Sequence, residues 1–167
     1  MTAEEITRYL TELNDELRLI DIKGEVSLFG GAVMVLAFKA RIATKDIDAI
    51  FEPVREIRNA AHRVAERHDL KLDWLNYAVR MFVVKHEREL LFELSNLRVT
   101  VPDADYLLAM KMLALRAETE DENDAIFLIK KLKLERKDEV LSIVADYYPK
   151  KEVSAKALVW LDEYFAR

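Results

Sequence analysis

The sequence contains no cysteine and only three glycines and three prolines among its 167 residues. Without cysteine, the chain forms neither disulfides nor cysteine-based zinc sites, which fits a reducing compartment. Long hydrophobic runs are also lacking: the longest, residues 32–38, is far too short to span a bilayer. The first residues have no basic segment followed by an apolar one, so they do not resemble a secretory signal. We therefore expect a soluble cytoplasmic protein with no membrane partner.

An excess of positive charge is absent as well. The chain has 26 lysines and arginines against 31 aspartates and glutamates, which gives a formal net charge of -5. This balance argues against a general electrostatic grip on nucleic acid, although a local basic groove is compatible with it. Hydrophobic residues make up 51% of the chain, enough for the core of one domain or of a domain with a helical extension.

The hydrophobic pattern predicts a mixed order of helices and strands. Helical spacing predicts three early helices, over residues 4–20, 32–41 and 53–68. Strand character predicts five strands, over residues 26–29, 46–51, 79–84, 90–94 and 97–101. We therefore expect an α/β (α+β) fold in which residues 1–101 form a small mixed sheet with flanking helices. Residues 102–167 have helical spacing only, so we expect a helical C-terminal half beginning at Pro102.

All three glycines lie in one short stretch, at positions 24, 30 and 31. Gly30 and Gly31 fall where a predicted strand turns into a helix. Glycine lets the backbone approach a phosphate closely or adopt a positive φ, and backbone N–H groups at such a turn can bind an anion. The alternative is a tight turn with close helix packing and no ligand.

Two aspartates, Asp46 and Asp48, follow on the next predicted strand. Alternate residues of a strand project to the same side, so both carboxylates could bind one divalent metal. Mg²⁺ (or Mn²⁺) binds a few carboxylates together with water and phosphate oxygens, such as those of a nucleoside triphosphate. Arg41 and Lys45 flank the loop before these acids and could neutralise a triphosphate. Taken singly, the acids could instead be solvated at a strand start, and the cations could belong to a solvated loop.

Six stretches together resemble the nucleotidyltransferase-fold superfamily. More narrowly, they resemble the abortive-infection (AbiEii-type) toxin nucleotidyltransferases and their bacterial relatives. The resemblance covers most of the chain from Val26 to Asp124. The matching stretches are Phe29–Leu36, Arg41–Asp48, Trp74–Asn76, Asn96–Pro102, Tyr106–Arg116 and Asp121–Asp124.

The resemblance implies a role for ten residues. It implies that Asp46 and Asp48 are catalytic and bind the metal. The phosphates of the nucleotide would be bound by Gly30, Gly31, Arg41, Thr44 and Lys45. In such enzymes a lysine on a later helix and an acid on the next helix complete the site, and Lys111 with Asp121 or Asp124 matches those positions. From the residues alone, Lys111 could instead snorkel to the surface, and the two later aspartates could cap a helix.

The function that the resemblance implies is transfer of a nucleoside monophosphate from a nucleoside triphosphate to a hydroxyl of RNA or protein. The setting would be a toxin–antitoxin or phage-defence pair, with an antitoxin protein as partner. Two features depart from the wider superfamily. The turn is Gly-Gly instead of Gly-Ser, and Glu93 is the only acid well placed on a later strand to be a third carboxylate. A catalytically silent module that binds a nucleotide or a partner protein is therefore the alternative.

Overall fold

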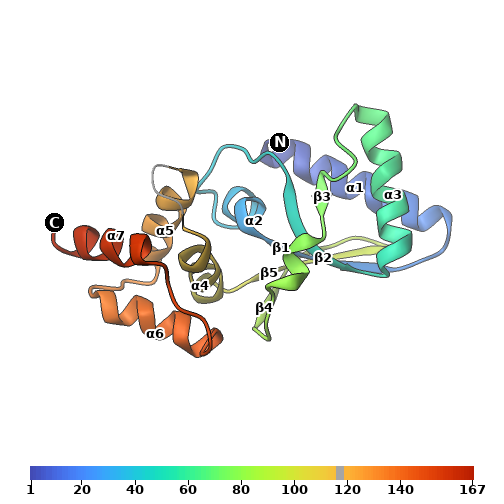
Figure 1. The fold of residues 1–167 in the computed structure, drawn as a ribbon. Helices are drawn as coiled ribbons and strands as arrows, with labels where there is room; N and C mark the ends of the chain where they lie inside the picture. Colours follow the sequence, from blue (N-terminus) through green and yellow to red (C-terminus); the bar gives the residue numbers. More distant parts are fainter. Residues whose placement is uncertain (116–118) are drawn as a thin grey trace. The chain divides into compact units, whose positions relative to one another are not determined.

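The computed structural model describes residues 1–115 and 119–167, which form two compact units. The first unit consists of Met1–Val83 with Arg88–Pro102, and the second of Val84–Glu87 with Asp103–Arg167. The strands belong to the first unit and helices α4 to α7 to the second (Figure 1). The expected fold class, a small mixed sheet with flanking helices and a helical C-terminal half, is confirmed.

The first unit is built on a five-stranded sheet with the strand order β3-β2-β1-β5-β4. Its strands are β1 (Gly24–Phe29), β2 (Ile47–Glu52), β3 (Leu75–Asn76), β4 (Arg88–Glu93) and β5 (Leu97–Pro102). The central strand β1 is antiparallel to β2 and parallel to β5. The sheet is therefore mixed, as the sequence predicts.

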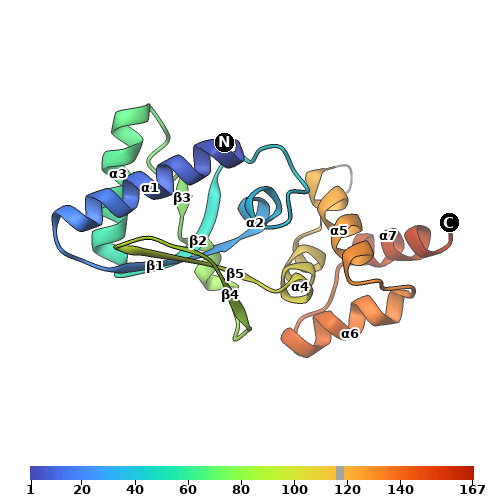
Figure 2. The same ribbon diagram turned by 180° about the vertical axis from the view of Figure 1, so that it is seen from behind.

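The two faces of the sheet differ in chemistry. One face is apolar and buried, and its residues are Val26, Leu28, Ile47, Ala49, Phe51, Leu97, Val99 and Val101. Helices α1 (Ala3–Leu19) and α3 (Val54–His68) pack against each other and against the sheet (Figures 1 and 2). Because strand residues alternate between faces, Ser27, Phe29, Asp48 and Thr100 share the opposite side, which we call the polar face.

Helix α1 begins as its sequence predicts. The Thr2 hydroxyl accepts a hydrogen bond from the Glu5 backbone N–H at 3.3 Å, and the Glu5 carboxylate accepts one from the Thr2 N–H at 3.2 Å. This reciprocal capping box satisfies two donors that the helix itself leaves open.

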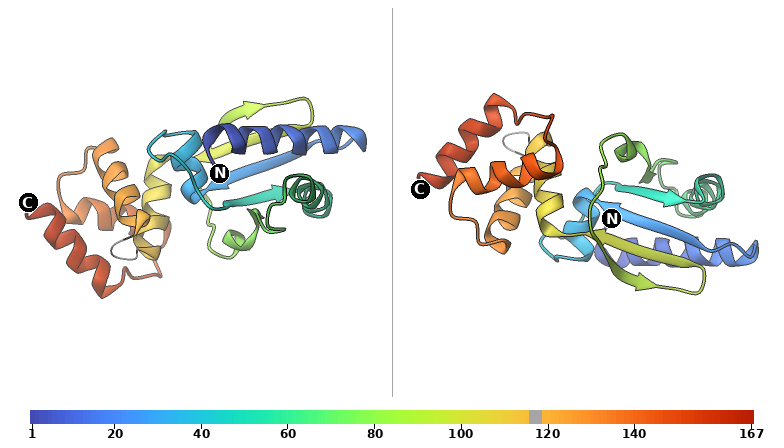
Figure 3. Two further views of the ribbon diagram at one scale, coloured as in Figure 1. Left: turned by 90° about the horizontal axis from the view of Figure 1, so that it is seen from above. Right: turned by 90° about the horizontal axis from the view of Figure 1, so that it is seen from below.

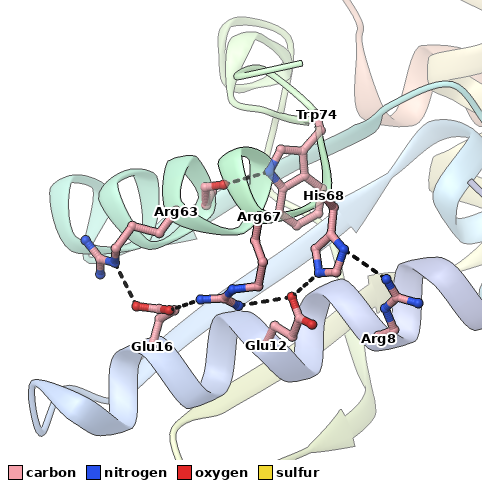
Figure 4. Close-up of polar contacts among 8 residues, drawn as sticks. Arg8, Glu12, Glu16, Arg63, Arg67, His68 and Trp74 are labelled. Atoms are coloured by element: carbon pink, nitrogen blue, oxygen red, sulfur yellow. Dashed lines mark hydrogen bonds and ion pairs between the residues drawn. The ribbon is translucent and has the colours of Figure 1, made fainter. Parts of the chain in front are cut away.

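An ion-pair cluster joins α1 to α3 (Figure 4). The carboxylate of Glu16 accepts hydrogen bonds from Arg63 Nε at 2.7 Å and from Arg67 Nη2 at 2.6 Å. Burial acts to raise the pKa of Glu16, but the hydrogen bonds and charges of the two arginines outweigh it and hold the pKa below its ordinary value. The ionised form of Glu16 therefore stabilises the packing of the two helices.

His68 extends the same cluster at the end of α3 (Figure 4). Its Nδ1 lies 2.9 Å from Arg8 Nη2, and its Nε2 lies 2.6 Å from a carboxylate oxygen of Glu12. Because a guanidinium only donates, Nδ1 must accept, and Nε2 carries the proton that is donated to Glu12. The geometry thus corresponds to a neutral imidazole, and His68 is a structural residue rather than a metal ligand.

We expect Glu16→Gln to lower the free energy of unfolding at pH 7 by about 1–2 kcal/mol. A carboxyl whose pKa is lowered by folding stabilises the protein above its unfolded pKa, and this contribution is lost as pH falls through the folded pKa. The difference between the two proteins should therefore shrink in acid. Urea denaturation at neutral and acidic pH, followed by Trp74 fluorescence in a Trp160→Phe background, measures it. Glu66→Gln, an exposed position on the partner helix α3, is the control. An equal loss at both pH values would contradict the prediction.

The second unit consists of α4 (Ala104–Ala114), α5 (Glu120–Lys131), α6 (Lys137–Tyr147) and α7 (Ala155–Phe165). Helix α4 packs against α5 and α6, and α6 packs against α7 (Figure 3). Tyr106 lies at the core of this unit: its hydroxyl accepts from the Val84 N–H at 3.0 Å and is 2.9 Å from the Tyr148 hydroxyl. The ring of His86 stacks on Tyr106 at 4.0 Å. These contacts explain why the short segment Val84–Glu87 belongs to the helical unit.

Two local predictions were wrong. Residues 79–84 do not form a strand, because Ala78–Met81 is a short 3-10 helix, η1. The side chain of Asn76 accepts a hydrogen bond from the Ala78 N–H at 2.8 Å, which turns the chain directly after the two-residue strand β3. The predicted helix 32–41 runs from Gly30 to Leu36 instead.

Candidate functional site

The glycine turn lies directly against one of the two predicted metal ligands. Strand β1 runs into α2 (Gly30–Leu36), and Gly30 has a φ of 60°. Residues with a Cβ adopt this conformation only at a cost. A Cβ atom built onto Gly30 would lie 3.0 Å from Oδ2 of Asp48. The register explains the contact, because Asp48 pairs with Phe29, the residue just before the turn.

The second glycine of the turn packs against the loop before β2. A Cβ atom at Gly31 would lie 2.6 Å from Oγ1 of Thr44 and 2.8 Å from Nη1 of Arg41. Thr44 is buried, its hydroxyl donates to the Asp46 carbonyl at 3.2 Å, and its N–H donates to the Met1 carbonyl at 2.9 Å. The fold therefore brings together the glycines, Arg41, Thr44 and Asp48, which are separated in sequence.

The two aspartates are not equivalent. Asp46 precedes β2, which begins at the buried Ile47, so the prediction that both acids lie on the strand was wrong for Asp46. Asp46 and Lys45 are exposed, whereas Asp48 is half-buried. The hydrogen bond from Thr44 to the Asp46 carbonyl lies at the end of the loop. Of the two aspartates, Asp48 alone pairs with β1 in the sheet.

The donor set fits a magnesium ion that is also bound by phosphate. Among the described residues, no group of three or more histidine and acidic side chains is arranged to hold a metal. The ligands that the sequence predicts are Asp46 and Asp48 alone, and water and phosphate oxygens would have to supply the rest, as they commonly do for Mg²⁺. The space beside the missing Cβ atoms is filled by Asp48 at Gly30 and by Thr44 and Arg41 at Gly31, so both glycines serve close packing of the turn, and Arg41 places a positive charge beside them.

The three remaining predicted residues form a buried ionic group in the second unit. Lys111 lies on α4, and its Nζ is 3.1 Å from a carboxylate oxygen of Asp121 and 2.8 Å from one of Asp124, both on α5. The side chain of Asp124 is 1% exposed and that of Lys111 10%. The N-cap of α5 is Thr119, so neither aspartate caps this helix, but Asp121 lies in its first turn, where its charge suits the helix dipole as the alternative expected. Lys111 is directed at both acids and does not snorkel.

The polar face offers no third carboxylate next to Asp48 in the described part of the chain. Strand β5, the neighbour of β1, presents the hydroxyl of Thr100 on this face. Glu93 pairs with Arg98, which in turn lies beside Glu25 near the start of β1. Asp48 is at the other end of β1, so Glu93 is not placed to act with it.

Sequence reasoning missed a polar group on the same face. The Ser27 hydroxyl accepts a hydrogen bond from Arg88 Nη1 at 3.0 Å and lies 2.9 Å from the Thr100 hydroxyl. Ser27 and Thr100 are both buried. The residues next to them in β1 and β5 are apolar and lie on the other face of the sheet. One hydroxyl residue in each of these two strands was the only sign of the polar group in the sequence. Nothing in the sequence indicated that the Arg88 side chain would contact Ser27.

Comparisons with protein-family models, curated proteins and solved structures found no match for this chain. The family resemblance therefore stays a prediction that depends on the residues themselves. Arg116, the last residue of one matching stretch, lies outside the described residues. Where the chain is described, no helix combines the length and the apolar character needed to cross a membrane.

We expect Gly31→Ala to lower the free energy of unfolding by about 1–3 kcal/mol, because the new methyl group would overlap the Thr44 hydroxyl. Thr44→Ala removes that hydroxyl, so the double variant should be less destabilised than the sum of the two single variants. Urea denaturation of the four proteins measures the coupling. Strict additivity would contradict the close packing of these two residues.

Proposed function

We propose that the protein is a metal-dependent nucleotidyltransferase. The observation that carries the proposal is the contact between the Gly30 turn and the Asp48 carboxylate. A backbone turn without side chains and a carboxylate suited to a metal are the two elements needed to bind the phosphates of a nucleoside triphosphate with Mg²⁺. Arg41, packed on Gly31, supplies a cation at the same place, whereas the hydroxyl proton of Thr44 is donated to the Asp46 carbonyl.

In this proposal Asp46 and Asp48 hold Mg²⁺ or Mn²⁺, which when bound neutralises negative charge on the phosphates. Gly30 and Gly31 let the triphosphate approach the backbone, and Arg41 with Lys45 binds its outer oxygens. A hydroxyl of the acceptor attacks the α-phosphorus in line, the bond to the β-phosphate oxygen breaks, and pyrophosphate leaves. The hydroxyl proton is released to water, because β5 presents no carboxylate beside Asp48 to accept it.

The ionic group of the second unit supports the proposal independently. Burying Lys111 with Asp121 and Asp124 costs desolvation energy that apolar residues would not cost. A buried ion pair is therefore weak evidence for a purely stabilising role. By the resemblance alone, Lys111 and one of these aspartates also take part in the reaction. On the same basis we extend the proposal to an RNA or protein acceptor, a cytoplasmic location and an antitoxin partner.

A second candidate function is a catalytically silent module that binds a nucleotide or a partner protein. The hydroxyl of Thr100 on the strand beside β1, where a third carboxylate would act on the acceptor, favours this candidate. It predicts nucleotide binding without transfer.

Two measurements test the proposal. Isothermal titration of the wild-type protein with each of the four ribonucleoside triphosphates, with Mg²⁺ and with EDTA, should show binding that requires the metal. Incubation with α-labelled nucleotide and total cellular RNA or protein should then label one acceptor. Absence of metal-dependent binding would refute the proposal, and binding without any labelling would favour the silent module.

A further inference from the structure

Arg88, at the start of β4, extends over the polar face of the sheet in the first unit. Its Nη1 donates to the Ser27 hydroxyl at 3.0 Å and lies 3.6 Å from a carboxylate oxygen of Glu25. Ser27 is two residues before Phe29 on β1, and Phe29 pairs with Asp48. Ser27, which anchors the guanidinium, is therefore on the same face as Asp48 and about 7 Å along β1 from Phe29, the residue that pairs with Asp48.

The guanidinium is fixed at one nitrogen only. Both contacts involve Nη1, and the described residues provide no hydrogen-bond or ion-pair partner for Nε or Nη2. The side chain is 45% exposed, while the two hydroxyls beneath it, those of Ser27 and Thr100, are buried and hydrogen-bonded to each other. The Nε and Nη2 edge of an arginine matches two oxygens of a phosphate, so Arg88 is positioned to bind one.

Arg88 is distinct from the cations assigned to the triphosphate. Arg41 packs on Gly31 from the loop before β2. Arg88 comes from β4, which is separated from β1 by β5, whereas β2 is the neighbour of β1 on its other side. If a nucleotide binds at the glycine turn, Arg88 would therefore be a second cation, on the opposite side of β1 from Arg41.

We propose that Arg88 binds a backbone phosphate of an RNA acceptor. This inference is based on the proposed nucleotidyltransferase function and names the acceptor class. Each nucleotide of an RNA strand offers a phosphate beside the reacting hydroxyl, whereas a protein hydroxyl has an anion for the free edge of Arg88 only where an acidic residue is its neighbour.

The test uses a fluorescein-labelled, single-stranded oligoribonucleotide of mixed sequence. Its affinity is measured by fluorescence polarisation without nucleotide, and it then serves as acceptor with α-labelled nucleoside triphosphate and Mg²⁺. Arg88→Ala should weaken RNA binding and raise the KM for RNA by about tenfold or more. Arg88→Lys keeps the positive charge and a donor for Ser27 but lacks the two parallel N–H donors that match a phosphate. It should therefore show a loss of RNA affinity between those of wild type and Arg88→Ala. It also keeps the test valid if Arg88→Ala does not fold.

Arg55→Ala is the matched control, because among the described residues this exposed arginine on α3 forms an ion pair with its neighbour Glu56 and with no other side chain. It should behave as wild type in both assays. Equal RNA binding by Arg88→Ala and Arg55→Ala would overturn the inference. An equal loss of affinity for the nucleoside triphosphate in Arg88→Ala would overturn it as well, since the bound phosphate would then belong to the nucleotide. Labelling of cellular protein but not of RNA by the wild type would overturn it in favour of a protein acceptor.

The two proposals fail in different ways. If the wild type shows no metal-dependent nucleotide binding, the nucleotidyltransferase proposal fails and with it the role of RNA as acceptor. Polarisation without nucleotide would still report whether Arg88 binds RNA. If nucleotide binding requires Mg²⁺ but RNA binding does not depend on Arg88, only the inference about the acceptor fails.

Discussion

Asp48→Ala should abolish metal-dependent nucleotide binding and lower nucleotidyl transfer by at least about a hundredfold. Asp48 is the one acid that lies both on the sheet and against the glycine turn, with Oδ2 3.0 Å from the position of a Cβ on Gly30. Its loss removes a metal ligand at the point where the phosphates would approach the backbone. Asp46→Ala should have a similar effect on metal affinity, because only these two acids are assigned to the ion.

Titration calorimetry with and without Mg²⁺, followed by the labelled-nucleotide assay, measures this effect. Asp48→Asn keeps the size of the side chain and removes its charge, so a loss equal to that of the alanine variant would show that charge is what matters. Glu52→Ala is the control, since Glu52 is an exposed acid on the same strand and the same face, at the far end of β2. Nucleotide binding by Asp48→Ala that matches wild type would refute the assignment.

Gly30→Ala tests the contact between the glycine turn and Asp48 by changing the glycine instead of the acid. The new methyl group would crowd the Asp48 carboxylate and force a residue with a Cβ into a φ of 60°. We expect nucleotide affinity to fall in this variant even though no metal ligand has been removed. An unchanged affinity would mean that the turn and the carboxylate act independently.

The fold was largely predictable because the strands have clear alternation. In β1 and β5 the buried valines and leucines alternate with polar residues, and Pro102 closes the last strand. The short strand β3 could not be predicted, since two residues give no periodicity. Residues 79–84 were predicted as a strand because they are apolar, but the hydrogen bond from Ala78 to the Asn76 side chain determines the local structure instead.

The candidate site was predictable in its residue types but not in its contacts. The alternate spacing of Asp46 and Asp48 identified them as candidate metal ligands. Only the register of β1 against β2 shows that Asp48 lies beside Gly30. Arg88 was missed because its role depends on a hydrogen bond to Ser27 across an intervening strand. Pairings between strands that are distant in sequence are set by the whole sheet, so no local pattern reveals them.

The second large effect is expected at the buried ionic group. Asp124→Ala should lower the free energy of unfolding of the helical unit by about 3–5 kcal/mol. Asp124 is fully buried and lies 2.8 Å from Lys111 Nζ, so its removal leaves a buried ammonium with Asp121 as its remaining carboxylate partner in the group. Asp121→Ala should cost less, because the Asp121 side chain is 18% exposed against 1% for Asp124.

The two tryptophans allow the units to be followed separately. Trp160 lies in the helical unit and Trp74 in the sheet unit, so urea denaturation in a Trp74→Phe background reports the helical unit. A loss in Asp124→Ala below about 1 kcal/mol, the range of exposed ion pairs, would contradict the buried geometry. The double variant Lys111→Met with Asp124→Leu removes both charges while keeping apolar volume, so it should recover most of the stability that Asp124→Ala loses.

The double variant Lys111→Met with Asp124→Leu also distinguishes a structural role of these two residues from a role in nucleotide transfer. If Lys111 and Asp124 serve only the helical unit, a stable double variant would bind nucleotide and transfer it as the wild type does. If they belong to the site, as the resemblance implies, the variant would be folded and inactive. We expect the second result, because an apolar pair could occupy this position between α4 and α5 without the desolvation cost of buried charges.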